Sequence, residues 1–237
     1  MLRKARSISL WLRRASTPST LAGRTLRLLP GVGAVIAAGV ASAALASVAV
    51  GRNQATSDAT PVLRRDDWVA AVSGGQALHE ARGNDTIVVF TDFQCPYCRA
   101  LAITLADLRA TRRATVHVVL RQFPLHKVHP HATAAAVAAV CAGHQRRLEP
   151  FHDYVFAHQE AIPRLDWDAI ASEIGVPEPI RFAECRGSIE ARRAIMSDIA
   201  IGNRLNVLGT PTVLVNGRRL AGPPTLAQIE RALRRPR

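Results

Sequence analysis

Two cysteines separated by two residues are the part of this 237-residue sequence best suited to chemistry. They lie in TDFQCPYCRA, where Cys95 and Cys98 follow closely on the apolar run at 87–90. A strand leading into C-x-x-C at a helix start favours a reactive thiol at Cys95, because free N–H groups and the helix dipole stabilise a negative sulfur there. Pro96 suits the first helical turn, where its missing N–H is not needed. Cys98 can then attack a mixed disulfide formed at Cys95.

Two other interpretations of the cysteine pair, a zinc site and a structural staple, have less support. A zinc site needs a second pair of ligands at matching spacing, but Cys141 and Cys185 are 44 residues apart. A staple across two residues closes too short a loop to stabilise the fold much. Three histidines at 126–131 lie in a loop that contains two prolines, so we expect surface or capping roles for them. We therefore expect no metal site and no cofactor.

The elements around the cysteine pair predict an α/β architecture. The β-branched run at 86–90 is typical of a strand buried on both faces. Leucines at helical spacing predict a helix over 99–110, and a second apolar run predicts a strand at 116–120. A strand, a helix and a strand at this spacing form a βαβ unit, which makes the two strands parallel.

A largely helical block is predicted at about 125–205, between the second and third strands. Its expected helices are at 131–147, 149–160, 166–174 and 189–205. A third strand at 212–215 runs into Asn216-Gly217, which favours a hairpin and a fourth strand at 218–220. A final helix is expected at 224–235, and a short helix at 68–72, capped by Asp66 or Asp67, before the first strand. The expected domain is a sheet of four or five strands with a helical insertion.

The formal charge of +13 is concentrated near the N-terminus. Residues 1–52 hold eight Lys and Arg and no acid, whereas the remaining 23 basic residues exceed the 18 acidic ones by five. Nucleic-acid binding requires a basic face on the folded part, and an excess of five is weak support for one. We therefore expect no nucleic-acid partner.

A charge-free span at 30–50 follows the basic leader at 1–29, and it is long enough to cross a bilayer. The basic flank before it places the following part outside the cytoplasm. The length of the span favours an uncleaved anchor, whereas its richness in Ala and Gly favours a signal peptide. Such a peptide would be cut after Ala44-Leu45-Ala46 or Ser47-Val48-Ala49. Both interpretations export the part after the linker at 51–65, where disulfides persist, and four cysteines allow three pairings.

Four segments together resemble the DsbA-like thioredoxin-fold thiol–disulfide oxidoreductases. They are TDFQCPYC after a strand, RQFPLH after the next strand, AAAVAAVCA in the helical block, and GTPTVLVNG. The resemblance covers about residues 66–235 and implies a thioredoxin-like domain at 66–237. It also implies that Pro211 is cis and lies against the cysteine pair, so that Thr210 offers its backbone to a client strand.

The resemblance implies further roles for named residues. Pro96 and Tyr97 would face the client, and Cys141 with Cys185 would form a structural disulfide. Two buried free thiols, or a relay pair that exchanges with the first two cysteines, are the alternatives for Cys141 and Cys185. Many relatives carry a buried acid six residues before the first cysteine, but this position is Val89 here. Asp92 either caps the turn or the helix, or takes part in proton transfer.

The function implied by the resemblance is that of an enzyme. The oxidised Cys95–Cys98 pair would take electrons from reduced exported proteins in the periplasm. A membrane-bound, quinone-linked reoxidase would restore the disulfide. Two alternatives stay open at this point. One is a disulfide reductase or isomerase, and the other is a non-catalytic module that binds metal or assists assembly through the same cysteines.

Overall fold

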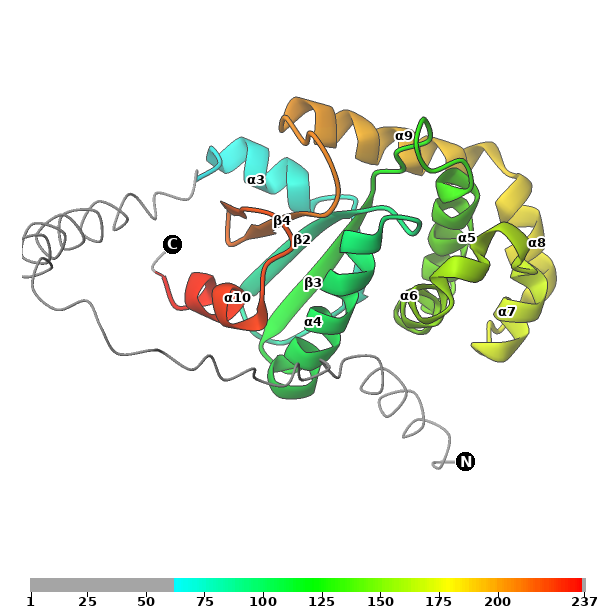
Figure 1. Ribbon diagram of the computed structural model, residues 1–237, viewed down its shortest axis with the longest axis horizontal. Helices are drawn as coiled ribbons and strands as arrows, with labels where there is room; N and C mark the ends of the chain where they lie inside the picture. The colour runs from blue at the N-terminus through cyan, green and yellow to red at the C-terminus, as the bar shows by residue number, and fades with distance from the viewer. Residues whose placement is uncertain (1–61, 236–237) are drawn as a thin grey trace, which may run out of the picture. The chain divides into compact units, whose positions relative to one another are not determined.

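A computed structural model of the protein describes residues 62–235 (Figure 1). The basic leader at 1–29, the apolar span at 30–50 and most of the linker at 51–65 lie outside the described residues. Within the part of the chain that is described, no helix has both the length and the apolar character needed to span a bilayer.

Five strands form one mixed sheet in the order β1-β3-β2-β4-β5. Their bounds are β1 Gln76–His79, β2 Asp85–Thr91, β3 Val116–Gln122, β4 Thr212–Val215 and β5 Arg218–Leu220. The central pair, β2 and β3, runs parallel, and the other neighbouring pairs run antiparallel. The predicted α/β architecture is confirmed, with one addition. Strand β1 has no β-branched residue, which is why the sequence pattern does not indicate it.

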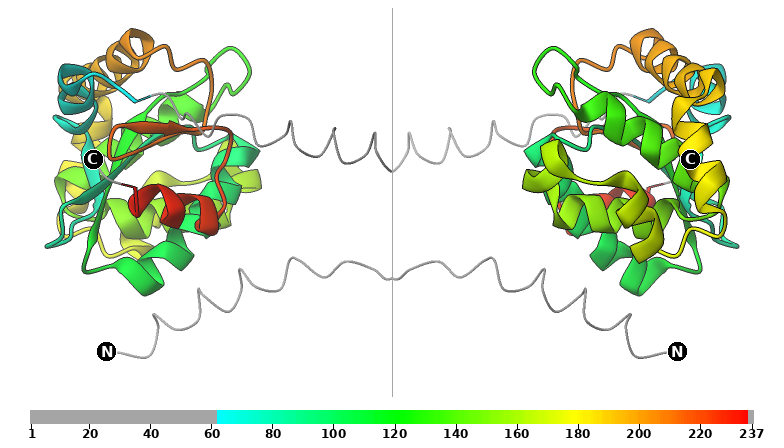
Figure 2. Two further views of the ribbon diagram at one scale, coloured as in Figure 1. Left: turned by 90° about the vertical axis from the view of Figure 1, so that its left-hand side faces the viewer. Right: turned by 90° about the vertical axis from the view of Figure 1, so that its right-hand side faces the viewer.

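Helices cover both faces of the sheet (Figures 1 and 2). On one face lie α3 (Arg65–Val72) and α9 (Ile189–Arg204), and on the other lie α4 (Pro96–Arg112) and α10 (Leu226–Leu233). Strand β2 is therefore buried on both sides. Its Ile87 and Val89 belong to the cluster under α4, whereas Val88 belongs to the cluster under α3. Such two-sided burial explains the continuous apolar run in this strand.

The helical block between β3 and β4 consists of five α-helices and one 3₁₀ helix. They are α5 (Ala132–His144), α6 (Leu148–Ala157), η2 (Gln159–Arg164), α7 (Trp167–Glu173), α8 (Pro179–Gly187) and α9. Helix α5 packs against α6, α8 and α9, and nine of its 13 residues are buried. The alanine side chains of α5 are small, so the neighbouring helices can approach it closely. A disulfide joins Cys141 in α5 to Cys185 in α8.

Two local expectations are wrong, and one helix was not expected. The residue that caps α3 is Arg64, without a side-chain hydrogen bond, and Asp66 and Asp67 lie inside the first turn. Helix α8 is absent from the sequence-based expectation, although Pro179 at its first turn is a helix-start residue. The segment expected as one helix at 149–160 ends at Ala157 and continues as η2, which contains Pro163.

A buried ion pair fixes the sheet to the helices on the face opposite α4. The guanidinium of Arg121 in β3 donates to Oδ1 of Asp198 in α9, at 2.6 Å, and the Arg side chain is 1% exposed. The same guanidinium donates to backbone carbonyls near the end of α3, at Ala70, Ala71 and Ser73. The carboxylate in turn accepts the backbone N–H of Gln122. One cation thus joins β3, α3 and α9.

Replacing Asp198 by alanine should lower the free energy of unfolding by about 3–5 kcal/mol, because it leaves the Arg121 charge buried and unpaired. Urea denaturation of the purified protein measures this loss. The matched control is Arg204→Ala, which removes a half-exposed arginine from its ion pair with Asp67 and should cost at most about 1 kcal/mol. Equal losses in the two variants would contradict the assignment.

Candidate active site

The turn after β2 places both cysteines at the start of α4. Cys95 is the N-cap residue, Pro96 occupies the first turn, and the Cys95 carbonyl accepts the backbone N–H groups of Cys98 and Arg99. Cys95 is 4% exposed and Cys98 is 2% exposed, and both are free thiols in this structure. Pro96 and Tyr97 between them are exposed. The two sulfurs therefore lie beneath a solvent-facing dipeptide.

The loop before β4 meets this turn from a distant part of the sequence. The Thr210–Pro211 peptide bond is cis, and Pro211 is buried. The Cys95 thiol donates to the Thr210 carbonyl oxygen at 3.2 Å. Antiparallel pairing of β4 with β2 brings the loop to the end of β2, where the cysteine turn begins. All of the residues that the resemblance places at the reactive centre are thus neighbours in space.

The two sulfurs differ in their acidity. A hydrogen bond from the Cys98 side chain is the largest cause that lowers the pKa of Cys95 to about 5, and burial opposes it. The Cys98 N–H, the Thr210 side chain and the Tyr97 N–H lower this pKa further. Burial raises the pKa of Cys98 well above the usual value for a thiol, and the neighbouring Cys95 raises it further. At neutral pH the turn therefore holds one thiolate and one thiol.

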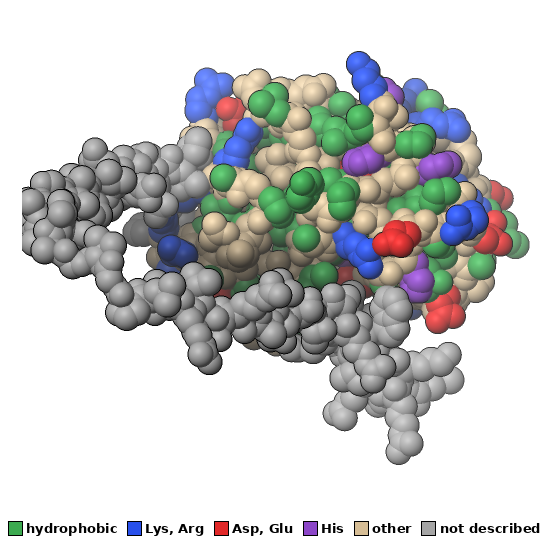
Figure 3. All heavy atoms as spheres, viewed as in Figure 1, with side chains coloured by type: hydrophobic (Ala, Val, Ile, Leu, Met, Phe, Trp, Pro, Cys, Tyr) green, Lys and Arg blue, Asp and Glu red, His purple; other side chains and the backbone are tan. Residues whose placement is uncertain are grey.

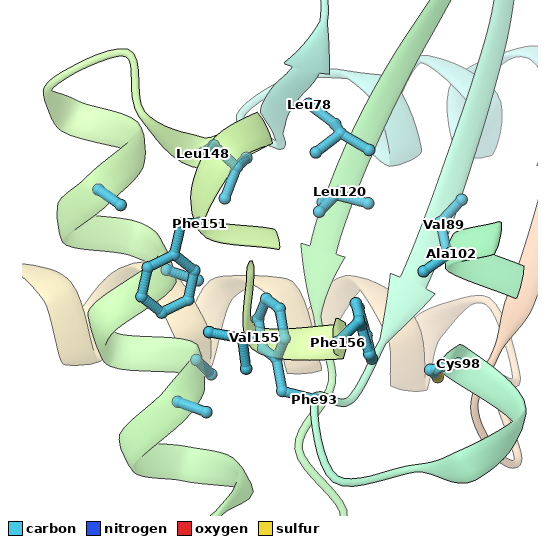
Figure 4. Close-up of a cluster of buried hydrophobic side chains, with 14 of the residues drawn as sticks. Leu78, Val89, Phe93, Cys98, Ala102, Leu120, Leu148, Phe151, Val155 and Phe156 are labelled. Carbon is cyan, nitrogen blue, oxygen red and sulfur yellow. The ribbon is translucent and has the colours of Figure 1, made fainter. Parts of the chain in front are cut away.

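An apolar wall explains the high pKa of Cys98. Figure 4 shows Cys98 beside Val89 and Ala102, at the edge of a cluster that includes Phe93 and Phe156. The rings of Phe93 and Phe156 stack with their centroids 4.9 Å apart. Such surroundings disfavour the charged form of a thiol.

Asp92 holds the turn through its carboxylate and meets Cys98 through its backbone. The carboxylate accepts the N–H groups of Gln94 and Leu125, and it pairs with Nδ1 of His129 at 2.8 Å. The backbone N–H of Asp92 points to Cys98 Sγ at 3.5 Å. Of the roles open to Asp92, this geometry favours the cap, because the carboxylate binds other donors and is 0% exposed.

Two glutamines that sequence reasoning missed also hold the turn. The Gln159 side-chain amide in η2 donates to the carbonyls of Phe93 and Cys95, at 2.8 and 2.9 Å. The Gln94 side chain accepts the backbone N–H of His131, at the start of α5. Nothing in the sequence around Gln159 indicates this contact, because it joins residues 64 positions apart. The helical block therefore holds the reactive turn in place.

Alkylation of reduced Cys95 by iodoacetamide should reach half its maximal rate near pH 5, since the thiolate is the nucleophile. Mass spectrometry of the digested protein separates the two cysteines, and Cys98 should stay unmodified throughout. Cys98→Ala should move the Cys95 midpoint upward, because it removes the largest stabilising hydrogen bond, and Cys98→Ser should move it less. A Cys95 midpoint near pH 8.5, that of a free thiol, would contradict the geometry.

Asp92→Asn should lower the free energy of unfolding by about 1–3 kcal/mol, because the amide carries one acceptor oxygen where the carboxylate offers two. Urea denaturation checks this value. Asp107→Asn is the control, since it changes an exposed aspartate on α4 by the same atoms and should have little effect. A loss no larger than that of the control would show that the three contacts of Asp92 do not hold the turn.

Comparisons with known proteins agree with this geometry. A family model described as thioredoxin matches residues 78–235. A thioredoxin-like oxidoreductase from Silicibacter pomeroyi DSS-3 is 25% identical, with 72% of this chain and 96% of that one covered and a TM-score of 0.59. The thiol-disulfide exchange protein alpha-DsbA2 from Wolbachia pipientis is 17% identical, with 71% and 90% covered and a TM-score of 0.60.

A part of several membrane transporters is also similar. The Na⁺/H⁺ antiporter NhaA 3 of Salinispora tropica is 33% identical over 148 residues, which are 62% of this chain and 22% of the antiporter. The chain spans about a fifth of the length of the curated relatives it matches. The match to the family model covers most of the described domain, including both cysteines and Pro211. The chain therefore belongs to the thioredoxin family, and its fold is that of the DsbA-like thiol–disulfide oxidoreductases.

Proposed function

We propose that the protein introduces disulfides into exported proteins through Cys95 and Cys98. The observation that carries this proposal is the position of Cys95 at the start of α4, where the pKa of its thiol is lowered to about 5. A stable thiolate is a good leaving group, and it favours the reduced form of the pair over the disulfide. Electrons then flow from the client to the protein.

The reaction starts from the Cys95–Cys98 disulfide. A client thiolate attacks Cys95 Sγ, the bond to Cys98 breaks with its electron pair left on Cys98, and a client–Cys95 mixed disulfide forms. A second client thiolate attacks the client sulfur of this bond and releases Cys95 as a thiolate. Two electrons have then passed from the client to the pair. A membrane-bound, quinone-linked reoxidase is the partner that we propose for their removal.

The surface around Cys95 supports contact with an extended client segment. The Thr210 carbonyl is 3.2 Å from the Cys95 sulfur and can pair with a client backbone by strand addition. Tyr97 is 63% exposed, and Leu208, two residues before Thr210, is 95% exposed. Figure 3 shows Lys and Arg scattered among hydrophobic side chains on the face viewed.

The location that we propose is extracytoplasmic, with residues 30–50 as a membrane tether or a signal peptide. Two features support it. The apolar span follows a basic leader, and a periplasmic thioredoxin-like protein from Salmonella enterica serovar Typhimurium has a similar fold, with a TM-score of 0.58. The disulfide between Cys141 and Cys185 also fits an oxidising compartment.

A disulfide reductase or isomerase is the second candidate, and the acidity of Cys95 is what keeps it open. A pKa of about 5 lies between the ~3.5 of a strong oxidant and the ~7 of a reductase thiol. The reduction potential of the pair, measured against glutathione, separates the two. The reduction potential of an oxidase should be closer to about −120 mV than to about −270 mV. A value near −270 mV would assign the protein as a reductase.

Cys95→Ser should abolish oxidation of a reduced, unfolded ribonuclease A. Reduced Cys98→Ser should accumulate a mixed disulfide with disulfide-scrambled ribonuclease A, because Cys95 attacks a client disulfide and the thiol that would then displace the client is gone. Non-reducing electrophoresis and mass spectrometry detect the adduct. The control is the double variant Cys141→Ser/Cys185→Ser, which should keep its turnover at a temperature where it is folded. Loss of turnover there would instead support a relay through the second pair.

The absence of any adduct with Cys98→Ser would count against thiol exchange. If the wild-type protein then retained one equivalent of a metal ion, this would favour a non-catalytic module that binds metal through the same cysteines.

A further inference from the structure

The resolving cysteine has to exchange a proton at a buried position. Cys98 is 2% exposed, and each catalytic cycle leaves it as a thiolate that must be protonated. On β2 and β3 the paired residues Val89 and Leu120 lie under α4, and neither side chain can carry a proton. Figure 4 shows both of them in the hydrophobic cluster that Cys98 borders. The proton must therefore pass through other groups.

The next residues on the same face of these two strands are polar. Thr91 pairs with Gln122 across β2 and β3, two residues beyond Val89 and Leu120 and so on the same side of the sheet. They are 3% and 1% exposed. The backbone N–H of the next residue, Asp92, points to Cys98 Sγ at 3.5 Å, and the Thr91 side chain favours the charged form of that sulfur. A hydroxyl close to the resolving sulfur thus stands beside an amide.

The amide of Gln122 is the unexplained group. Neither its oxygen nor its nitrogen has a hydrogen-bond partner among the described residues, although both atoms are buried. A buried amide without partners is costly, and such groups commonly bind an internal water. The neighbouring Thr91 hydroxyl offers that water another partner, because adjacent strands lie about 4.8 Å apart.

We propose that Thr91 and Gln122 form the proton-exchange site of Cys98. This inference rests on the proposed thiol exchange at Cys95 and Cys98. The Thr91 hydroxyl donates to the Cys98 thiolate as it forms, and the Gln122 amide holds one water molecule against that hydroxyl. Thr91 and Gln122 are thus positioning residues for the proton, and the sulfur atoms carry the electrons.

The protons balance over the cycle. Each client thiol releases one proton to solvent when it becomes a thiolate. The Cys98 thiolate takes the proton of the Thr91 hydroxyl, and the hydroxyl takes one proton from the bound water in return. The hydroxide left behind is neutralised by one of the released protons. The other proton stays in solvent, because Cys95 leaves as a thiolate. No oxidant beyond the Cys95–Cys98 disulfide is consumed in these steps.

The other titratable groups near Cys98 do not fill this role. The Cys95 thiolate faces it from the N-cap of α4 and disfavours a second charge. The Asp92 carboxylate, at the end of β2, pairs with His129 from the β3–α5 loop. From α6, His152 lies against Phe93 and Phe156, and burial lowers its pKa, so it is neutral. Neither Asp92 nor His152 takes the place of the polar pair.

The test follows the reduced full-length protein, with the Cys141–Cys185 disulfide intact, as it reacts with the coloured reagent dithiobis-nitrobenzoate. Cys95 attacks first and releases one nitrothiolate. Cys98 then attacks the mixed disulfide and releases the second, so the pH dependence of the second phase reports the Cys98 proton. Thr91→Val and Gln122→Leu should each slow this phase about tenfold at pH 7, which is the effect of one pKa unit. The midpoint of its pH dependence should move to higher pH.

Several controls separate this role from a structural one. Thr91→Ser keeps the hydroxyl and should keep the wild-type second phase. Gln76→Leu removes a partly buried amide from β1 of the same sheet and should change neither phase. The first phase should be the same in all variants, and thermal unfolding checks that each is folded. If Thr91→Val does not fold, Gln122→Leu decides alone.

An unchanged second phase in the folded variants would overturn the proposal. So would an Asp92→Asn variant that shifts the second phase in place of them, because the carboxylate would then be the proton carrier. Different results would contradict the proposed function. A wild-type protein that shows no second phase, or a first phase with the pH dependence of a free thiol, would remove the exchange chemistry itself.

Discussion

The effect of the two cysteine side chains of the reactive turn on each other is the interaction on which the site depends. It stabilises the Cys95 thiolate, and it requires Cys98 to keep its proton. Burial under an apolar wall enforces that second condition, because it penalises charge on Cys98. A single turn of helix thus separates a good leaving group from a thiol that stays protonated until it is needed. Neither property belongs to one cysteine alone.

The rest of the fold keeps these two sulfurs at one place. Strand β2 delivers them, β4 brings Thr210 and Pro211 alongside, and the helical block reaches back through Gln159. The block is itself held by the Cys141–Cys185 disulfide and by the Arg121–Asp198 pair. Each of these contacts joins residues far apart in the sequence, so the geometry of the turn is a property of the whole domain. A thiolate held by fixed N–H groups needs such rigidity, because its pKa changes with small shifts of the donors.

The framework can be predicted from the sequence, but much of the site cannot. Four local patterns each indicate one structure. They are the apolar run of β2, the C-x-x-C at a helix start, the alanines of α5 and the Asn216-Gly217 hairpin. Strand β1 and helix α8 lack such patterns. The contacts of Gln159, His129 and Gln122 arise only when distant elements meet, and a polar residue in an ordinary segment carries no sign of them. The cis bond is predicted only through the family resemblance.

The most direct measurement of the central claim is a pH titration of the reduced protein by nuclear magnetic resonance, with the cysteine Cβ atoms labelled with carbon-13. Both sulfurs are then observed in one sample without chemical modification. The Cys95 resonance should titrate near pH 5, whereas the Cys98 resonance should stay that of a thiol above pH 9. Two resonances that titrate together at the ordinary pH of a thiol would contradict it, because the turn would then not distinguish its sulfurs.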